Sequence, residues 1–175
     1  MPRSQQPLEG ERAVIERVRI LNPILLLDVG AGDGKWGSLL RPLQIPHTAA
    51  IEVWQPTAEK LAKARIYDDV LHMDARKFGA WACFTVILLG DVLEHMPRAD
   101  AEKLIKEAGE YSTLLLTIPI SLCVQDGNLL GNPYETHVEQ WTHEQVLALG
   151  FRLLHRGFNQ AGTVEIGTYE RSPLP

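Results

Sequence analysis

The sequence has little of what small domains use to build metal clusters or disulfide frameworks. It contains only two cysteines, Cys83 and Cys123, far apart in the chain. Their spacing matches neither a metal-binding pattern nor a disulfide-rich one. Both lie in apolar stretches, where a free cysteine behaves as a small hydrophobe. We therefore expect two reduced thiols in the core and no metal site.

The chain also lacks a hydrophobic run long enough to cross a membrane. Its longest mostly apolar stretches, residues 81–89 and 114–124, are shorter than the roughly 18–20 residues of a spanning helix. The first twenty residues carry charges throughout and contain no apolar run typical of a secretory signal. These absences predict buried strands, no membrane span and a cytoplasmic location.

No internal repeat, low-complexity segment or Ser/Gly linker divides the chain. Its 45% hydrophobic and 22% charged residues are typical of a globular protein. A length of 175 residues suffices for one sizeable core but not for two catalytic domains, so we expect a single domain over residues 1–175. The net charge of −5 and the scattered basic residues argue against a nucleic-acid partner.

What the sequence does have is an alternation of apolar strands and amphipathic helices. The alternation predicts that the first five strands form a parallel sheet, since parallel neighbours require crossover connections. The last two strands are separated by residues 159–162 alone, which predicts an antiparallel hairpin. We expect helices at residues 9–21, 35–41, 55–65, 98–110 and 142–149, and strands at residues 24–29, 48–53, 69–72, 84–89, 112–118, 151–157 and 163–169.

The predicted fold class is therefore α/β, with a mostly parallel seven-stranded sheet, an antiparallel C-terminal hairpin and helices on both faces. Residues 1–22 supply a lead-in helix. Residues 120–141 show little periodicity, and a loop of this length in a compact domain is usually functional. We expect it to cover a substrate pocket.

A glycine-rich turn follows the first strand, in the segment Asp28-Val29-Gly30-Ala31-Gly32-Asp33-Gly34. Glycine allows a sharp turn and lets a ligand lie against the backbone. The free N–H groups of the next helix suit an anionic group, and open parallel sheets bind ligands at this edge. The segment predicts a ligand site, although a tight turn without a ligand would have the same sequence.

An acidic residue, Glu52, ends the second strand some twenty residues after the glycines. A carboxylate at this place can accept hydrogen bonds from both hydroxyls of a ribose. A glutamate at a strand end is often only a solvated charge. Its combination with the glycine turn favours the ribose site.

Together these residues resemble the class I S-adenosylmethionine (SAM)-dependent methyltransferases, over nearly the whole chain. Within that family the chain is most similar to small single-domain enzymes of the quinone-biosynthesis type. The resemblance implies a Rossmann-like fold with SAM as the cofactor. The family pattern Asp-x-Gly-x-Gly-x-Gly falls on Asp28, Gly30, Gly32 and Gly34, which would hold the methionine half, and Glu52 would bind the ribose.

The resemblance also implies contacts to the adenine and to the reacting methyl. Asp74, with Ala75 beside it, would contact the adenine amino group. Val53 and Trp54 would flank the adenine ring, although Trp54 is equally consistent with an ordinary surface or core aromatic. Asp91 would lie beside the transferring methyl, the alternative being an N-cap or loop carboxylate.

On the acceptor side, the segment Glu135-Thr136-His137 resembles the part of these enzymes that covers the acceptor pocket. Methyl transfer needs an acceptor lone pair in line with the S–CH₃ bond, and no covalent enzyme intermediate. A hydroxyl acceptor would also benefit from a general base, for which His95 and His137 are the candidates. Each also fits a structural role. We expect O- or N-methylation of a small molecule or glycan, with a non-catalytic SAM-binding module as the alternative.

Rival cofactor patterns are not met. A dinucleotide fingerprint would need glycine where the chain has Lys35, and a phosphate-binding loop would need Ser or Thr in place of Trp36. Amino-methyltransferases of nucleic acids carry Pro-Pro-aromatic after the fourth strand, where this chain has Asp91. The similar Asn132-Pro133-Tyr134 lies beyond the fifth strand and predicts a loop turn. Cys83 precedes its strand, which excludes a cytosine-methyltransferase nucleophile.

Overall fold

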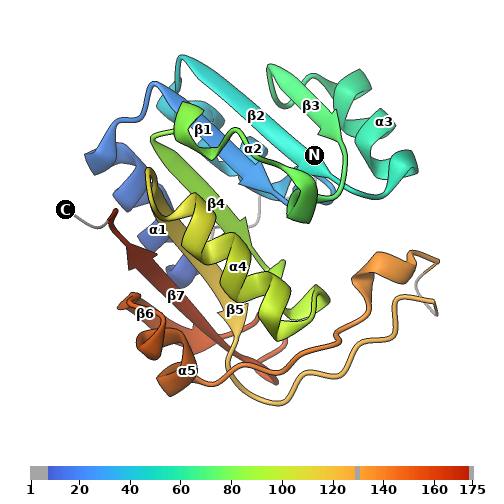
Figure 1. Ribbon diagram of the computed structural model, residues 1–175, viewed down its shortest axis with the longest axis vertical. Helices are drawn as coiled ribbons and strands as arrows, with labels where there is room; N and C mark the ends of the chain where they lie inside the picture. Colours follow the sequence, from blue (N-terminus) through green and yellow to red (C-terminus); the bar gives the residue numbers. More distant parts are fainter. Residues whose placement is uncertain (1–7, 129–130, 174–175) are drawn as a thin grey trace.

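The computed structural model describes residues 8–128 and 131–173, so the expected positions 1–7 of the lead-in segment and 129–130 of the long loop lie outside it. The described residues form one seven-stranded sheet in the order β3-β2-β1-β4-β5-β7-β6 (Figure 1). Strands β1 to β5 are parallel, and β7 is antiparallel to both of its neighbours. The strands are β1 (Leu25–Val29), β2 (His47–Glu52), β3 (Asp69–His72), β4 (Val86–Gly90), β5 (Thr113–Pro119), β6 (Arg152–Phe158) and β7 (Glu165–Arg171).

Helices cover both faces of the sheet, as the sequence predicts. Leu26, Val86 and Leu88 face one side with Val14 and Val18 of α1, whereas Leu27, Ile87 and Leu89 face the other side with residues of α4. This alternation along buried strands is the two-residue period of β-structure. Figure 1 shows α4 in front of the sheet and α1 and α2 behind it. The helices are α1 (Glu9–Leu21), α2 (Lys35–Leu40), α3 (Gln55–Ala64), α4 (Arg98–Ala108) and α5 (His143–Ala148).

The fold class predicted from the sequence is confirmed, with shifts of one or two residues at most element ends. The fifth strand, expected over residues 112–118, ends one residue later, at Pro119, which is in register with Ile166 of β7. The capping Thr142 does begin α5, because its hydroxyl accepts a hydrogen bond from the backbone N–H of Gln145. None of the helices in the described ranges is both long and apolar enough to span a bilayer.

The two cysteines are not core residues, which corrects the expectation. Both thiols are free, but Cys83 is exposed and Cys123 is partly exposed. Cys83 ends a short 3₁₀ turn, Trp81–Cys83, in which Trp81 is the buried member. Cys123 lies in the long loop that leaves β5. Trp81 therefore belongs to the core, whereas Leu122 and Val124, which flank Cys123, are 77% and 84% exposed.

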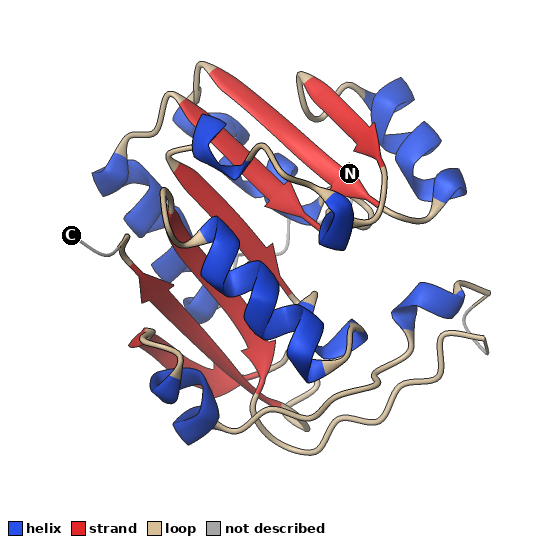
Figure 2. Ribbon diagram, viewed as in Figure 1, coloured by secondary structure: helices blue, strands red, loops and turns tan. Residues whose placement is uncertain are grey.

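The long loop runs from the end of β5 to the start of α5 and extends beyond the carboxyl ends of the central strands (Figure 2). Its returning half is fixed to the segment after β4, since the backbone N–H groups of Val138 and Glu139 both donate to the Glu94 carbonyl, at 2.9 and 3.1 Å. Arg98 of α4 holds the same half by donating to the Gln140 carbonyl at 2.7 Å. The loop is thus held against the carboxyl edge of the sheet.

Candidate active site

The sheet creates a ligand cleft where its strand order reverses. Strands β2 and β3 lie on one side of β1, and β4 and β5 lie on the other, so the connections leave β1 and β4 in opposite directions. A crevice opens at such a reversal, at the carboxyl ends of the strands. The glycine-rich turn and the segment after β4 both lie at this edge.

The glycine turn is held by the neighbouring strand. The backbone N–H groups of Gly30 and Ala31 donate to the Ile51 carbonyl at 2.9 and 3.1 Å. Gly30 has a φ of +69°, and a Cβ there would lie 2.7 Å from the Val92 side chain. Only glycine therefore lets the turn approach the chain that follows β4.

Glu52 joins the end of β2 to the glycine turn. It is 5% exposed, and its two carboxylate oxygens accept from the backbone N–H groups of Gly32 at 2.9 Å and Trp54 at 2.7 Å. Each oxygen retains a second lone pair. The carboxylate is therefore fixed in position and still able to accept hydrogen bonds from a ligand.

A cleft of about 100 Å³ lies between the turn, the ends of β2 and β3 and the segment after β4. Six residues expected at a cofactor site line it, and so does one of the two candidate bases, His95. The six are Gly30, Glu52, Val53, Asp74, Ala75 and Asp91. Sequence reasoning missed Ile51, Met73, Arg76, Val92, Met96, Asn132 and Tyr134, and it expected Glu135 only over the acceptor pocket.

The other four residues expected at the cofactor site, Asp28, Ala31, Gly32 and Gly34, do not line this cleft. Gly34 has a φ of +80°, and a Cβ there would lie 2.8 Å from both Leu61 and Ile66. Its glycine thus permits close packing against α3 and the chain that follows. Asp28, Ala31 and Gly34 are buried behind the turn, whereas a Cβ at Gly32 would meet no side chain within 4 Å.

Asp28 lies beneath the turn and is 1% exposed. Its carboxylate accepts a hydrogen bond from the Tyr67 hydroxyl, which itself accepts from the backbone N–H of Gly37 at 2.9 Å. Burial raises the pKa of Asp28 to about 7, and nearby Glu52 adds to the shift, while the Tyr67 hydrogen bond and Lys35 oppose it. The residue supports the turn through α2 and the chain before β3.

Of two residues expected near the adenine, Asp74 lines the cleft and Trp54 does not. The Asp74 carboxylate lines the cleft but is engaged by the Arg76 guanidinium at 2.6 to 3.0 Å. Hydrogen bonding to Arg76 lowers its pKa. Trp54 does not line the cleft; its ring lies 6.0 Å from the Tyr134 ring of the long loop. Trp54 is therefore a contact between the end of β2 and the loop.

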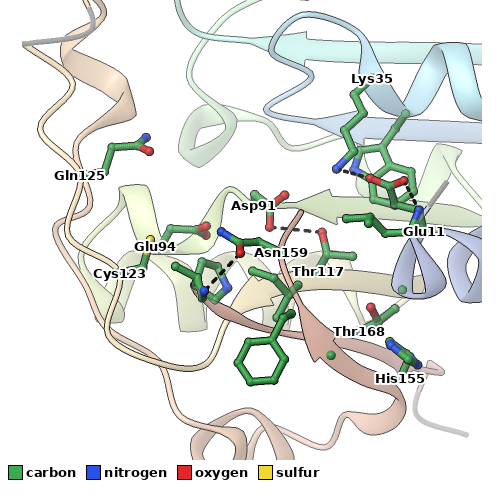
Figure 3. A pocket seen from close by; sticks show the side chains of 18 of the residues that line it. Glu11, Lys35, Asp91, Glu94, Thr117, Cys123, Gln125, His155, Asn159 and Thr168 are labelled. Atoms are coloured by element: carbon green, nitrogen blue, oxygen red, sulfur yellow. Dashed lines mark hydrogen bonds and ion pairs between the residues drawn. The ribbon is translucent and has the colours of Figure 1, made fainter. Parts of the chain in front are cut away.

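A second cavity, of about 470 Å³, adjoins the cleft (Figure 3). Asp91, His95 and Glu135 line both spaces. The N-terminal end of α1, the start of α2, β5, the long loop and the C-terminal hairpin form the rest of the wall. Through these shared residues the cavity and the cleft meet at the segment after β4.

Asp91 lies where the two spaces meet. It has a φ of +53°, its backbone N–H donates to the Thr117 carbonyl at 2.9 Å, and its carboxylate accepts from the Thr117 hydroxyl at 3.5 Å. The side chain is accessible from the cavities, yet the surrounding protein limits its hydration and raises its pKa. Val92, not Asp91, occupies the N-cap of the following 3₁₀ turn, so the N-cap alternative does not apply.

The two candidate histidines are brought together although they are far apart in the sequence. Their rings are 4.8 Å apart, centroid to centroid. His95 Nδ1 is 3.2 Å from the Thr136 carbonyl and His137 Nδ1 is 2.8 Å from the Cys123 carbonyl. Burial lowers the pKa of His95, which favours the neutral imidazole. Both histidines line the larger cavity.

Glu94 is a residue of the site that sequence reasoning missed. It is 2% exposed, and neither carboxylate oxygen has a hydrogen-bond partner among the described residues. Burial raises its pKa well above the usual range, with the charge of Asp91 adding to the effect. In Figure 3 its side chain points into the cavity, beside Cys123. A charged residue among the apolar Val92, Leu93 and Met96 was the available signal.

Comparisons with known proteins were made by sequence and by structure. No protein-family model matches the sequence, and no curated protein sequence matches it. Solved structures do match. The N-terminal domain of EvdMO1 with SAH bound is 15% identical with a TM-score of 0.67, covering 98% of this chain and 82% of that chain.

Two further structures resemble the chain to a similar extent. The methyltransferase domain of bacterial CtHen1-C is 16% identical with a TM-score of 0.65, covering 95% of this chain and 100% of that chain. Magnesium protoporphyrin IX methyltransferase (ChlM) from Synechocystis PCC 6803, with bound SAH, is 16% identical with a TM-score of 0.63. The match covers 93% of this chain and 84% of that chain. The chain therefore has the Rossmann-like fold of class I methyltransferases.

Proposed function

We propose that this chain is a SAM-dependent methyltransferase acting on a small-molecule or glycan acceptor. The observation that carries the proposal is the meeting of two spaces at Asp91, His95 and Glu135. A donor in the smaller cleft would present its sulfonium toward the larger cavity. An acceptor in that cavity would then lie in line with the S–CH₃ bond.

The cleft residues fit the parts of SAM in sequence order. Gly30 would lie against the methionine half, the fixed carboxylate of Glu52 would accept from the ribose hydroxyls, and Val53, Asp74 and Ala75 would surround the adenine. Because Arg76 already engages Asp74, an adenine amino group would share that carboxylate with the guanidinium. Asp28, Ala31, Gly32 and Gly34 would act by shaping the turn.

On the acceptor side, His95 and His137 line the cavity next to the expected methyl position. For a hydroxyl acceptor, one of these histidines would accept the proton as the oxygen attacks the methyl. Asp91 would orient the acceptor or the amino-acid end of the donor. We propose that this chemistry belongs to one domain over residues 1–175 and takes place in the cytoplasm.

The test of the cofactor site is calorimetric binding of SAM and of its demethylated product. Glu52→Ala removes the acceptor of two backbone hydrogen bonds as well as the ribose contact. Hydrogen bonds to a carboxylate contribute about 1.5–3 kcal/mol each, so affinity should fall by at least about 10-fold to 100-fold.

Asp33→Ala is the matched control, because Asp33 belongs to the same turn but is exposed, pairs with Lys60 and lines neither cavity. Its SAM affinity should equal that of the wild type. Equal affinities for Glu52→Ala and wild type would remove the site assignment. Transfer of labelled methyl to a pool of metabolites and glycans distinguishes an enzyme from a non-catalytic SAM-binding module.

A further inference from the structure

Three side chains with ligating atoms converge at the junction of the two spaces. Glu94 and His95 come from the 3₁₀ turn after β4, and His137 comes from the returning half of the long loop. One ligand atom from each residue lies within 4.8 Å of the others. Bonds of about 2.0–2.2 Å to one ion place ligand atoms up to about 4.4 Å apart. Small side-chain rotations therefore bring all three to one ion.

The hydrogen bonds of the two histidines leave one nitrogen of each ring free to bind an ion. A carbonyl oxygen can only accept, so the Nδ1 atoms of His95 and His137 must carry hydrogen when they bond to Thr136 and Cys123. Nε2 of each neutral ring then keeps its lone pair. Metal-bound histidines commonly donate their other ring N–H to a carbonyl in this way, which fixes both tautomer and ring orientation.

The Glu94 carboxyl supplies an independent indication of a missing partner. Both of its oxygens are buried and have no hydrogen-bond partner among the described residues, and the side chain faces the cavity. A buried polar group without a partner is costly in either protonation state. A cation bound to the carboxylate would offset that cost.

The backbone holds the ligands in this arrangement. The Glu94 carbonyl accepts from Val138 and Glu139, which directly follow His137 in the loop. Asp91 and Glu135 add two further carboxyl groups to the walls around the cluster. The long loop, which contains His137, is thus hydrogen-bonded directly to the backbone of Glu94.

We propose that Glu94, His95 and His137 bind a divalent transition-metal ion beside the reacting methyl. Two imidazoles and one carboxylate suit ions such as Zn²⁺, Mn²⁺ or Co²⁺ better than Mg²⁺ or Ca²⁺, which prefer oxygen ligands alone. Three protein ligands leave coordination positions open toward the cavity. This departs from the sequence-based expectation of no metal, which rested on cysteine spacing.

With such an ion present, the acceptor atom would be an oxygen. This inference rests on the proposed methyltransferase function. A hydroxyl bound to the ion would have a lowered pKa and would release its proton to solvent. The oxygen lone pair would then form the bond to the methyl carbon while the S–C bonding pair stayed on sulfur, giving a methyl ether and a thioether. With the ion bound, His95 and His137 would act as ligands, and activation by the ion would replace the general-base role that they have in the metal-free mechanism proposed above.

The test is titration of the metal-free full chain with Mn²⁺, Co²⁺ or Zn²⁺ in a calorimeter, without SAM. We expect one ion per chain, with Mg²⁺ binding much more weakly. Glu94→Gln and His137→Ala should each weaken Co²⁺ binding by more than about 100-fold, since even loss of an outer partner of a metal ligand costs 10-fold to 100-fold. His155→Ala is the control, because His155 lines the same cavity outside the cluster.

Two results would overturn the site: no stoichiometric Co²⁺ or Zn²⁺ binding to the wild type, or equal loss of binding in His155→Ala. Should a variant fail to fold, the absorption spectrum of Co²⁺ bound to the wild type still decides, because imidazole ligation must be visible in it. Glu94 does not line the SAM cleft, so Glu94→Gln should keep SAM affinity. A chain that binds SAM but no metal ion would refute the metal site and leave the proposed methyltransferase function standing. A chain that binds the metal ion but not SAM would refute the methyltransferase function alone.

Discussion

Asp28 is a residue whose ionisation is tied directly to the stability of the fold. Its pKa is about 7 in the folded chain, against an ordinary value of 3.8, chiefly because it is buried. Between these two values the folded state keeps a proton that the unfolded state has released. Asp28 should therefore destabilise the fold progressively as pH rises from about 4 to 7, by up to about 1.4 kcal/mol per pH unit, and by a constant amount above 7.

The measurement is urea unfolding of wild type and Asp28→Asn across this pH range. Asparagine keeps an oxygen to accept from the Tyr67 hydroxyl but does not titrate, so the stability of the variant should fall less with rising pH. Other carboxyl groups with a raised pKa, such as that of Glu94, are present in both chains, so their effect cancels when the two stability profiles are compared. Asp33→Asn, an exposed change in the same turn, should run parallel to wild type. If the stability of Asp28→Asn changed with pH in the same way as that of the wild type, the raised pKa of Asp28 would be contradicted.

For single residues, the sequence predicts those site residues whose role follows from a local motif. The glycine turn places Gly30 at the edge of β1, and β2 ends at Glu52, so both reach the cleft without help from distant segments. Tyr134 and Glu135 were not expected there, because their position depends on how a long loop returns across the sheet. Asp28 matched a motif, yet the partner that keeps it beneath the turn, Tyr67, lies far along the chain.

The long loop is anchored by one side chain of α4 in addition to the backbone hydrogen bonds at Glu94. The Arg98 guanidinium donates to Glu139, to the Gln140 carbonyl and to Gln145 at 2.7 to 3.3 Å. It also lies 4.1 Å from the centre of the Trp141 ring. Loops of this kind open locally at a lower free energy than the core does. Arg98 therefore controls how firmly the returning half of the loop covers the cavity.

Arg98→Ala should loosen residues 131–141 more than it affects the sheet. Losing charge-assisted hydrogen bonds and the ring contact should cost about 1–3 kcal/mol. Hydrogen exchange should be faster in this segment, and protease should cut it sooner, while β1 and β4 keep their protection. Lys103→Ala, on the same helix and with a long ion pair to Glu107 at 3.8 Å, should change neither. Uniform exchange through the whole chain would count against a local anchor.

Helices and strands were predictable because each is encoded by its own periodicity. The start of β4 was misplaced, because Phe84 and Thr85 are apolar or β-branched but belong to a connection in which Ser112 donates to the Phe84 carbonyl at 2.7 Å. The path of residues 120–141 was not predictable in the same way. It is fixed by single contacts from Glu94 and Arg98, which leave no periodic pattern in the sequence.

For the whole molecule, topology followed from connection lengths. Crossover helices required parallel neighbours, and the short 159–162 link required a hairpin, so the seven-stranded sheet could be predicted. The position of α1 could not, because an amphipathic helix does not specify which part of a sheet it covers. In the structure α1 packs behind the central strands and also reaches the C-terminal hairpin, where Arg17 pairs with Glu170 at 2.6 Å.

Glu170 connects the two ends of the chain and provides a test of the whole fold. It lies in β7, is 1% exposed, and pairs with Arg17 of α1 and Arg152 of β6. Removing one partner of a buried ion pair leaves an uncompensated charge and typically costs about 3–5 kcal/mol. Glu170→Ala should lower the free energy of unfolding by this order, because Arg17 is mostly buried.

Urea unfolding followed by circular dichroism measures this loss. Glu59→Ala is the control, because this exposed glutamate accepts a hydrogen bond from Gln55 within α3 and its loss should cost less than about 0.5 kcal/mol. Glu170 lines neither cavity, so at temperatures where the variant stays folded it should bind SAM as tightly as the wild type. A Glu170→Ala chain as stable as the control would mean that α1 is held to the sheet by its apolar face alone.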